Sequence, residues 1–394
     1  MKNHILILSH LFPNNKNSKS GVFILEQAKH IRRLGYDVSV ISPVGVTIQK
    51  DMIFPNKGII NSWRLWIKWR FGIKKKDIID EIRVYYLKHY YLSTNRKQQL
   101  SSFLNATFTK VLGINKSKSI SLIHAHSVFP DGVAGEIIAR RLNIPVVISG
   151  MGNDIRRFSQ NKGIKGIVNR SLQSSGAIIL KAKSLQEFLE FDKKKLSFIH
   201  NGVNLNKFSY DRKVHRNSIL FIGNLEKTKG VFELVSAFNK ISKNFKSIKL
   251  ILIGDGNARV ALNNYIMKNN LDTKVKLLGW RDQSELVKYY QQALVFCLPS
   301  YQEGTPNVIM ESAACGTPIV ATDIDGISDI LIDEIGYLCE YGSVEDLEEK
   351  IKTALEQNWN YEKIRRYAVK NFDINNQVMK INNIYQNLLT RNLF

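Results

Sequence analysis

Cysteines and long apolar runs are both scarce in this sequence, and each absence narrows the class of protein. The three cysteines are Cys297, Cys315 and Cys339, all in apolar stretches of the second half. Their spacing matches no metal site, and three cysteines make no disulfide framework, so we expect a reducing, cytoplasmic compartment. The sequence contains no run of about 18 apolar residues, so we expect no membrane-spanning helix. The opening MKNHILILSH predicts a first strand rather than a signal peptide.

Acidic residues are scarce in the first half only. Residues 1–200 contain 33 Lys and Arg against 12 Asp and Glu, whereas residues 201–394 contain 24 against 22. The net charge of +23 therefore belongs almost entirely to the first half. Such asymmetry favours an anionic partner, and a lysine-rich surface kept for solubility is the alternative. No nucleic-acid recognition motif accompanies the charge, so we expect a membrane surface or anionic lipid and no nucleic acid.

Short β-rich runs alternate with longer amphipathic stretches along the chain. One series is HILILSH, DVSVISP, ISLIHAH, IPVVISG and GAIILKA; a second is SILFIGN, KLILIGDG, KVKLLGW, ALVFCLPS and TPIVATD. This alternation predicts doubly wound, mostly parallel α/β sheets. We predict two Rossmann-like domains, 1–200 and 201–376, with a helix at 377–394 that completes the first. Ligands should bind in the loops after the strands, in a cleft between the domains.

Residues 63–92, WRLWIKWRFGIKKKDIIDEIRVYYLKHYYL, depart from this alternation. The segment mixes three tryptophans and four tyrosines with many cations. Aromatic residues combined with cations are typical of an element at a membrane interface. A packed helical hairpin with a basic, solvated face is the alternative. We expect this segment to contact an anionic membrane, which predicts a peripheral location at the inner face of the cell membrane.

Two histidines stand in HAHSVFPDG (124–132). His124 and His126 are two residues apart on a predicted strand, so both should point to the same side. His126 ends the strand and should face the predicted cleft. A structural histidine bonded to a loop carbonyl is the alternative. No third ligand at metal spacing is present, so we expect no zinc.

Lys229 and Gly21 follow other predicted strands. Lys229, in IGNLEKTKG (222–230), opens a helix, where a cation opposes the helix dipole unless an anion lies between them. Gly21 ends the loop SHLFPNNKNSKSG (9–21) and would let a phosphate approach the backbone. IGDGNAR (253–259) is a similar turn. A purely structural use of these glycines is the alternative.

The stretch EGTPNVIMESAACGTP (303–318) predicts a helix that binds an anion. Thr305 is a good N-cap, and Pro306 suits the first helical turn. The free N–H groups around Thr305, Asn307 and Val308 would form a hole for a diphosphate.

Two carboxylates, Glu303 and Glu311, bracket this helix start. A carboxylate beside a diphosphate would repel it, but one that reaches past it accepts hydrogen bonds from hydroxyls. A nucleotide sugar carries hydroxyls on both sides of its diphosphate. Acids that stabilise the helix dipole are the alternative, which explains one glutamate better than two.

These residues resemble those of a known family. EGTPNVIME resembles the Glu–seven residues–Glu motif of the retaining glycosyltransferases of family 4, which have the GT-B fold. IHAHSVFPDG, GMGNDI, HNGVNLNKF, GNLEKTKG and GTPIVATDIDG are similar to other segments of that family, in the same order. The resemblance covers nearly the whole chain and implies two Rossmann-like domains facing across a cleft.

The resemblance implies a role for each motif residue of the second domain. Glu311 should bind the ribose, and Glu303 should contact the transferred sugar. Lys229 and the amides from Gly304 to Val308 should hold the diphosphate, and Trp280 with Arg281 should lie near the base. The arginine usual in this family is Asn224 here, so one positive charge is missing from the leaving-group site.

In the first domain, which binds the acceptor in this family, the resemblance places His126 at the donor sugar. Gly21 would let its loop close over the phosphates, and Asp154 of GMGNDI would face the cleft.

The implied reaction is retaining transfer from a UDP- or GDP-sugar to an acceptor hydroxyl. A lipid-linked precursor of lipopolysaccharide or capsule is the expected acceptor. Lys229 and the peptide dipoles can stabilise the leaving diphosphate without a metal, so we expect neither a metal nor a cofactor. One alternative is a soluble transferase acting on a small acceptor. Another is a lipid- or polyanion-binding protein with a degenerate active site, because Asn224 replaces the arginine. Nucleotide-sugar epimerases have a similar fold but would not need the whole motif set.

Overall fold

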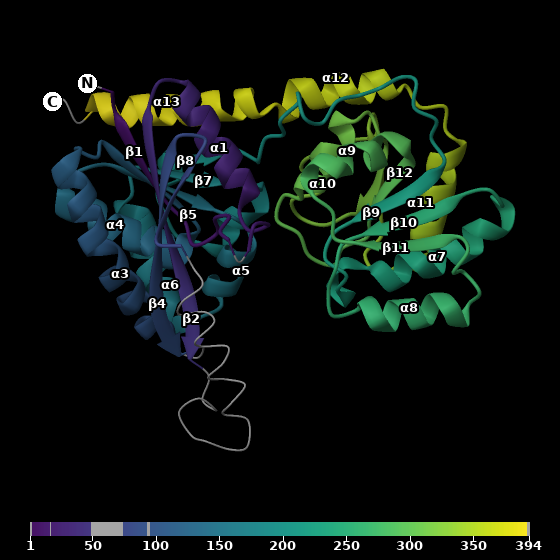
Figure 1. The fold of residues 1–394 in the computed structure, drawn as a ribbon, viewed down its shortest axis with the longest axis horizontal. Helices are drawn as coiled ribbons and strands as arrows, with labels where there is room; N and C mark the ends of the chain where they lie inside the picture. The colour runs from purple at the N-terminus through teal and green to yellow at the C-terminus, as the bar shows by residue number, and fades with distance from the viewer. Residues whose placement is uncertain (1, 16, 49–73, 93–94, 392–394) are drawn as a thin grey trace, which may run out of the picture. The chain divides into compact units, whose positions relative to one another are not determined.

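The chain forms two compact units, each built on its own sheet (Figure 1). The computed structural model describes residues 2–15, 17–48, 74–92 and 95–391. Unit 1 comprises Met1–His200 with Val378–Phe394, and unit 2 comprises Asn201–Gln377. Both units are α/β, as the alternation of apolar and amphipathic runs predicts.

The sheet of unit 1 has the order β3-β4-β2-β1-β5-β6-β7-β8. Its strands are β1 (His4–Leu8), β2 (Asp37–Ile48), β3 (Lys76–Ile79), β4 (Ile82–Leu92), β5 (Leu122–His126), β6 (Val146–Gly150), β7 (Ala177–Leu180) and β8 (Leu196–Phe198). All neighbours pair in parallel except β3 with β4. The strand order reverses between β1 and β5, and a crevice for ligands forms at such a reversal in doubly wound sheets.

The helical elements of unit 1 follow the strands in chain order. They are α1 (Val22–Arg33), α3 (Arg96–Ser117), η2 (Val128–Gly132), α4 (Val133–Leu142), α5 (Asn153–Ser159), α6 (Lys162–Ser174), η3 (Lys183–Phe188), η4 (Lys193–Lys195) and the C-terminal α13 (Ile374–Arg391). The first residues of α13, up to Gln377, belong to unit 2, and from Val378 on the helix packs into unit 1: Tyr36 Oη donates to Asn382 Oδ1 at 2.7 Å, and the ring of Tyr385 is fully buried.

The sheet of unit 2 is entirely parallel, with the order β11-β10-β9-β12-β13-β14. Its strands are β9 (Ser218–Ile222), β10 (Lys249–Ile253), β11 (Val275–Gly279), β12 (Ala293–Leu298), β13 (Ile319–Thr322) and β14 (Gly336–Cys339). Its helices are η5 (Lys227–Lys229), α7 (Val231–Asn244), α8 (Arg259–Lys268), α9 (Gln283–Gln292), α10 (Asn307–Ala314), α11 (Val344–Glu356) and α12 (Tyr361–Phe372). Figure 1 shows α9 and α10 on one side of this sheet and α7 and α8 on the other.

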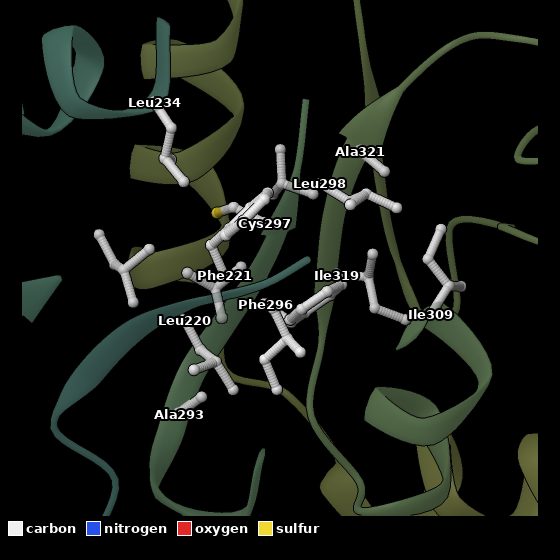
Figure 2. Close-up of a cluster of buried hydrophobic side chains, with 14 of the residues drawn as sticks. Leu220, Phe221, Leu234, Ala293, Phe296, Cys297, Leu298, Ile309, Ile319 and Ala321 are labelled. Carbon is white, nitrogen blue, oxygen red and sulfur yellow. The ribbon is translucent and has the colours of Figure 1, made fainter. Parts of the chain in front are cut away.

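The core of unit 2 forms around the two central strands, β9 and β12 (Figure 2). Both strands are apolar on each face because helices cover both sides of a parallel sheet. Phe221 and Phe296 are fully buried, and Ile309 of α10 packs into the same cluster. Burial of Ile309 fixes the position of α10 relative to the end of β12. The three cysteines are buried free thiols.

The structure corrects one alternative for the segment 63–92. Residues 63–73 lie outside the described residues, so the expected membrane element is described only from residue 74 on. Residues 76–92 form the antiparallel hairpin of β3 and β4, not a helical hairpin. Its two-residue turn, Asp80 and Glu81, has positive φ angles of 47° and 63°. The β pattern prevails because Ile82 and Val84 are buried while Arg83 between them is exposed.

Within the described ranges, no helix is sufficiently long and apolar to cross a membrane.

Candidate active site

The loops that follow β9 and β12 meet where the strand order of unit 2 reverses. Lys229, on the β9 loop, donates from Nζ to Glu303 Oε1, on the β12 loop, at 2.6 Å. Ser300 Oγ donates to the same carboxylate oxygen at 2.8 Å. The side chains of Lys229 and Glu303 are 21% and 13% exposed, so a ligand can still reach both. The structure thus brings together two residues that the motifs single out 74 positions apart.

Close backbone contacts hold the loops of this site together. Gly230 has a φ of +65°, and a Cβ there would lie 2.0 Å from the carbonyl oxygen of Pro299. Tyr301 N–H also donates to Thr228 O at 2.9 Å. Gly326, in the loop after β13, has a φ of +84°, and its Cβ would lie 1.5 Å from Gly304 O. The glycines therefore allow backbone segments to touch where any side chain would separate them.

The start of α10 differs from the sequence prediction. The helix begins at Asn307, and its N-cap is Pro306 in an extended conformation, not Thr305. The reason is that a residue preceding proline is disfavoured in the helical region, so Thr305 stays outside the helix. The N–H groups of Asn307 and Val308 lie in the first turn, where no intrahelical acceptor exists. The side chain of Asn307 is held by Asn201 Nδ2 at 2.9 Å.

Glu311 lies one turn further along α10 and is almost completely buried. Its Oε1 accepts a hydrogen bond from Gln283 Nε2 at 2.8 Å, and its Oε2 accepts one from Tyr290 Oη at 2.9 Å. Burial raises the pKa of Glu311, although these two donors and the charge of Lys207 act in the opposite direction. A carboxylate offers about four lone-pair positions, so about two remain for hydroxyl groups of a ligand.

Sequence reasoning missed the two donors to Glu311. Gln283 and Tyr290 lie on α9, outside every recognised motif, and Lys207 Nζ donates to Gln283 Oε1 at 2.8 Å. No local pattern marks these residues, because their role exists only once α9 packs beside α10.

The residues predicted near the nucleotide base follow an outer strand. Trp280 is 39% exposed and comes directly after β11, and Arg281 Nη1 donates to its carbonyl oxygen at 3.1 Å. β11 is separated from β9 by β10 and is parallel to both, so these residues lie at the same edge of the sheet as Lys229. Asn224 follows β9, is exposed, and donates to Glu226 Oε1 at 3.5 Å.

In unit 1, His124 and His126 point to the same side, as predicted. Their rings stack with centroids 4.2 Å apart. His124 is hydrogen bonded to Tyr385 Oη at 2.5 Å and to Ser149 Oγ at 2.8 Å. Gln27 Nε2 lies 3.5 Å from His126 Nε2.

His126 ends β5, as expected, and its ring is fully buried. Burial, together with the neighbouring His124 and Lys181, lowers the pKa of His126 well below its usual value. The imidazole is therefore neutral at physiological pH. Lys181 itself is buried after β7, which lowers its pKa to about 8, and sequence reasoning did not single it out.

Asp154 and Gly21 support loops at the carboxyl edge of the unit 1 sheet. Asp154 accepts hydrogen bonds from the N–H of Val128 at 2.7 Å and of Met151 at 2.8 Å, which joins the loops after β5 and β6. Burial raises the pKa of Asp154 against these donors. Gly21 caps α1 with a φ of +65°, and a Cβ there would lie 2.0 Å from Leu11 O. Gly21 therefore has the close backbone contact that a purely structural use of this glycine requires.

In the part of the chain that the structure describes, no group of three His, Cys, Asp or Glu side chains is placed to hold a metal ion.

Solved structures identify the architecture as GT-B. Sucrose-phosphate synthase from Thermosynechococcus elongatus superposes with a TM-score of 0.77 at 17% identity, over 99% of this chain and 100% of that one. Anabaena HepE in complex with UDP gives a TM-score of 0.73, also at 17% identity, over 98% and 100%. At these identities the similarity shows the fold: a GT-B protein with two Rossmann-like units.

Sequence comparison identifies the family. Residues 20–207 match Glycosyltransferase Family 4, and residues 203–371 match Glycosyl transferases group 1. An uncharacterized glycosyltransferase of Methanocaldococcus jannaschii is 31% identical over 284 residues, which cover 70% of this chain and 78% of that protein. The chain therefore belongs to the family 4, group 1 glycosyltransferases, as the motif resemblance predicted.

Two further relatives have more specific names. The putative teichuronic acid biosynthesis glycosyltransferase TuaC of Bacillus subtilis is 25% identical over 382 residues, 90% of each chain. The UDP-Gal:alpha-D-GlcNAc-diphosphoundecaprenol alpha-1,3-galactosyltransferase of Escherichia coli is 27% identical over 303 residues, 68% of this chain and 76% of that enzyme.

Proposed function

We propose that this glycosyltransferase moves a sugar from a UDP- or GDP-sugar to a hydroxyl of a lipid-linked glycan precursor, with retention of configuration and without a metal. The observation that carries the proposal is the contact of Lys229 with Glu303 at 2.6 Å, beside the start of α10. The Lys229 cation, the Glu303 carboxylate and two first-turn N–H groups of α10 thus come together where the strand order of the unit 2 sheet reverses.

Each part of this arrangement suits one part of a nucleotide sugar. Lys229 and the N–H groups of Asn307 and Val308 would hold the diphosphate and stabilise its charge as it leaves. Glu303, already oriented by Ser300, would accept hydrogen bonds from hydroxyls of the transferred sugar. Glu311 would accept them from the ribose with the lone pairs that Gln283 and Tyr290 leave available.

In the leaving-group site, Asn224 brings no charge, so Lys229 and the peptide dipoles would carry most of the stabilisation. Trp280 offers a partly exposed ring on which a base can stack, with Arg281 beside it.

Three observations support the lipid-linked acceptor. The Escherichia coli relative acts on a diphosphoundecaprenol-linked sugar, according to its name. The Bacillus relative is named as a putative glycosyltransferase of teichuronic acid biosynthesis. The first half of this chain carries almost all of the net positive charge, which favours association with an anionic membrane surface. A transferase acting on a small soluble acceptor is the competing outcome.

The first experiment is a thermal-shift screen of the full chain against UDP-, GDP- and ADP-sugars. The hit is then used as a labelled donor with extracted membrane lipids and, in parallel, with simple sugars. Label that partitions into the lipid phase supports the proposal, and label found only on the soluble sugars contradicts the lipid acceptor. Two further measurements test the absence of a metal and the retention of configuration. Turnover should be unchanged in EDTA, and NMR should assign to the product the same anomeric configuration as in the donor.

Lys229→Met tests the phosphate site, and Lys227→Met is its matched control because Lys227 is exposed on the same short helix η5. We expect Lys229→Met to lower kcat by about 100-fold or more, the low end for a lost transition-state contact of this kind, whereas Lys227→Met stays near wild type. Equal effects of both variants would contradict the assignment of Lys229.

A further inference from the structure

A chain of hydrogen bonds leads from a half-buried lysine to the carboxylate of Glu311. Lys207 Nζ donates to Gln283 Oε1 at 2.8 Å, and Gln283 Nε2 donates to Glu311 Oε1 at 2.8 Å. All three residues belong to unit 2, and α9 and α10, which carry Gln283 and Glu311, lie on the same side of its sheet (Figure 1). The chemistry of the first contact decides the orientation of the second.

The ammonium group of Lys207 fixes the orientation of the Gln283 amide. An ammonium can only donate hydrogen bonds, whereas an amide has an accepting oxygen and a donating nitrogen. Lys207 therefore holds the amide oxygen toward itself and turns the nitrogen toward Glu311. Without Lys207, the amide can rotate and place its oxygen against the carboxylate, where two acceptors face each other and no hydrogen bond forms.

The backbone that carries Lys207 is anchored to α9 and α10. The next residue, Phe208, is 1% exposed, and its ring packs against Tyr290 of α9 with centroids 6.0 Å apart. Arg365 Nη1 donates to the carbonyl oxygen of Phe208 at 2.5 Å and to that of Ala314, the last residue of α10, at 2.6 Å. These contacts hold the backbone of Lys207 beside the helix that carries its partner.

Gln283 is also held in place, at the start of α9. The N-cap of this helix is Asp282, whose N–H donates to Glu285 Oε2 at 3.1 Å, as in a capping box. Gln283 is the first residue of the helix and comes two residues after Arg281, which is assigned to the base. It therefore joins the segment assigned to the base to Glu311, which is assigned to the ribose.

The orientation of Gln283 decides what Glu311 can offer a ligand. With Gln283 and Tyr290 both donating, the carboxylate remains an acceptor, and the charge of Lys207 also opposes the rise in its pKa that burial causes. An ionised carboxylate accepts hydrogen bonds from hydroxyl groups. A ribose carries two adjacent hydroxyl groups, and a 2′,3′-dideoxyribose carries neither.

We propose that Lys207 is a positioning residue that sets the selectivity of the donor site for ribose over dideoxyribose, acting through Gln283 on Glu311. This inference rests on the proposed binding of a nucleotide sugar with its ribose at Glu311. Lys207 does not contact the ligand in this assignment. It keeps the carboxylate oriented and ionised for the hydroxyl groups.

The test measures, by calorimetry, the affinity for the nucleoside diphosphate of the donor found in the screen and for its 2′,3′-dideoxy form. Wild type should bind the dideoxy form at least about tenfold more weakly, the low end for lost hydrogen bonds to a charged group. Lys207→Met should bind the ribose form about tenfold more weakly than wild type does and the dideoxy form equally well. The matched control is Lys288→Met, because Lys288 is exposed on the same helix as Gln283, and it should match wild type.

A Lys207→Met protein that keeps the wild-type selectivity overturns the inference. Equal weakening of both forms overturns it as well, because that result indicates direct attraction between Lys207 and the diphosphate. At saturating donor, kcat of Lys207→Met should stay within about threefold of wild type, since a contact made equally before and during the reaction affects KM alone. A loss of kcat as large as that of Lys229→Met contradicts a role confined to the ribose.

Two further variants test whether Lys207 acts through Gln283. The double variant Lys207→Met with Gln283→Met should be no less selective than Gln283→Met alone, because the two residues form one path. Additive losses would contradict that path. Lys207→Arg should retain the selectivity, since a guanidinium also only donates.

If Lys207→Met does not fold, Gln283→Met carries the same comparison, and wild-type selectivity in that variant overturns the inference. A wild-type protein that binds the ribose and dideoxy forms equally contradicts the ribose assignment of Glu311 and this inference together. A selective wild type with an equally selective Lys207→Met contradicts this inference alone.

Discussion

Replacing Tyr290 with phenylalanine removes one of the two donors to the buried carboxylate of Glu311. The hydroxyl of Tyr290 lies 2.9 Å from Glu311 Oε2, and the tyrosine is fully buried. The substitution keeps the ring, which packs against Phe208 and Phe296, so it creates little new cavity. The substitution therefore leaves the buried Oε2 of Glu311 without the hydrogen bond that Tyr290 donates.

The expected cost follows from the chemistry of that contact. A hydrogen bond to a charged group contributes about 1.5–3 kcal/mol, and Glu311 cannot recruit water easily at 5% exposure. We expect Tyr290→Phe to lower the free energy of unfolding by about 2 kcal/mol at a pH above the raised pKa of Glu311, where the carboxylate is ionised. The loss should shrink as the pH falls and Glu311 becomes protonated, because the neutral carboxyl depends less on that donor.

Urea denaturation of both proteins across pH measures this difference. The matched control is Tyr265→Phe, since Tyr265 is half-buried in the same unit and its hydroxyl makes no hydrogen bond among the described residues. The control should stay within about 0.5 kcal/mol of wild type. If Tyr290→Phe costs no more than the control, or costs the same at every pH, the reasoning about Glu311 is refuted.

Three further substitutions, two in unit 2 and one in unit 1, test the stability of the protein. Glu311→Gln should remove a pH dependence: burial raises the pKa of Glu311, so the wild-type free energy of unfolding falls as pH rises through that pKa. If the free energy of unfolding of Glu311→Gln still falls over the same pH range, another group causes this pH dependence. Gly326→Ala should destabilise the protein by roughly 2 kcal/mol or more, because its Cβ would lie 1.5 Å from Gly304 O at a φ of +84°. Gly113→Ala, in helix α3 with open space around it, should instead be neutral or stabilising by up to about 1 kcal/mol, as measured by thermal denaturation.

Local sequence signals failed where two rules competed or where two periodicities overlapped. Thr305 is a good N-cap by residue type, yet the following proline excludes it from the helix and makes Pro306 the cap. Residues 63–92 are rich in aromatics and cations, which suggested a membrane-interface element, with a packed helical hairpin as the alternative. The alternation of buried Ile82 and Val84 with exposed Arg83 instead gives strands. In both cases the deciding signal was local: the proline that follows Thr305, and the alternation of apolar and polar residues at the start of β4.

The sequence by itself determined the fold class and the family. Apolar runs of strand length alternate with amphipathic ones, and this alternation is enough to require helices on both faces of parallel sheets. The ordered motifs, from HAHSVFPDG to GTPIVATDIDG, identify the glycosyltransferase family because their order is far more specific than any one of them.

Only the tertiary structure decided which side chains meet. Lys229 and Glu303 are 74 residues apart, yet they meet where the strand order of the unit 2 sheet reverses. The burial of His126 and the donors to Glu311 were likewise invisible in the sequence. The physical reason is that hydrophobic periodicity fixes which elements form and which faces they bury. Hydrogen bonds between loops depend on strand order, which is set by packing of the whole sheet.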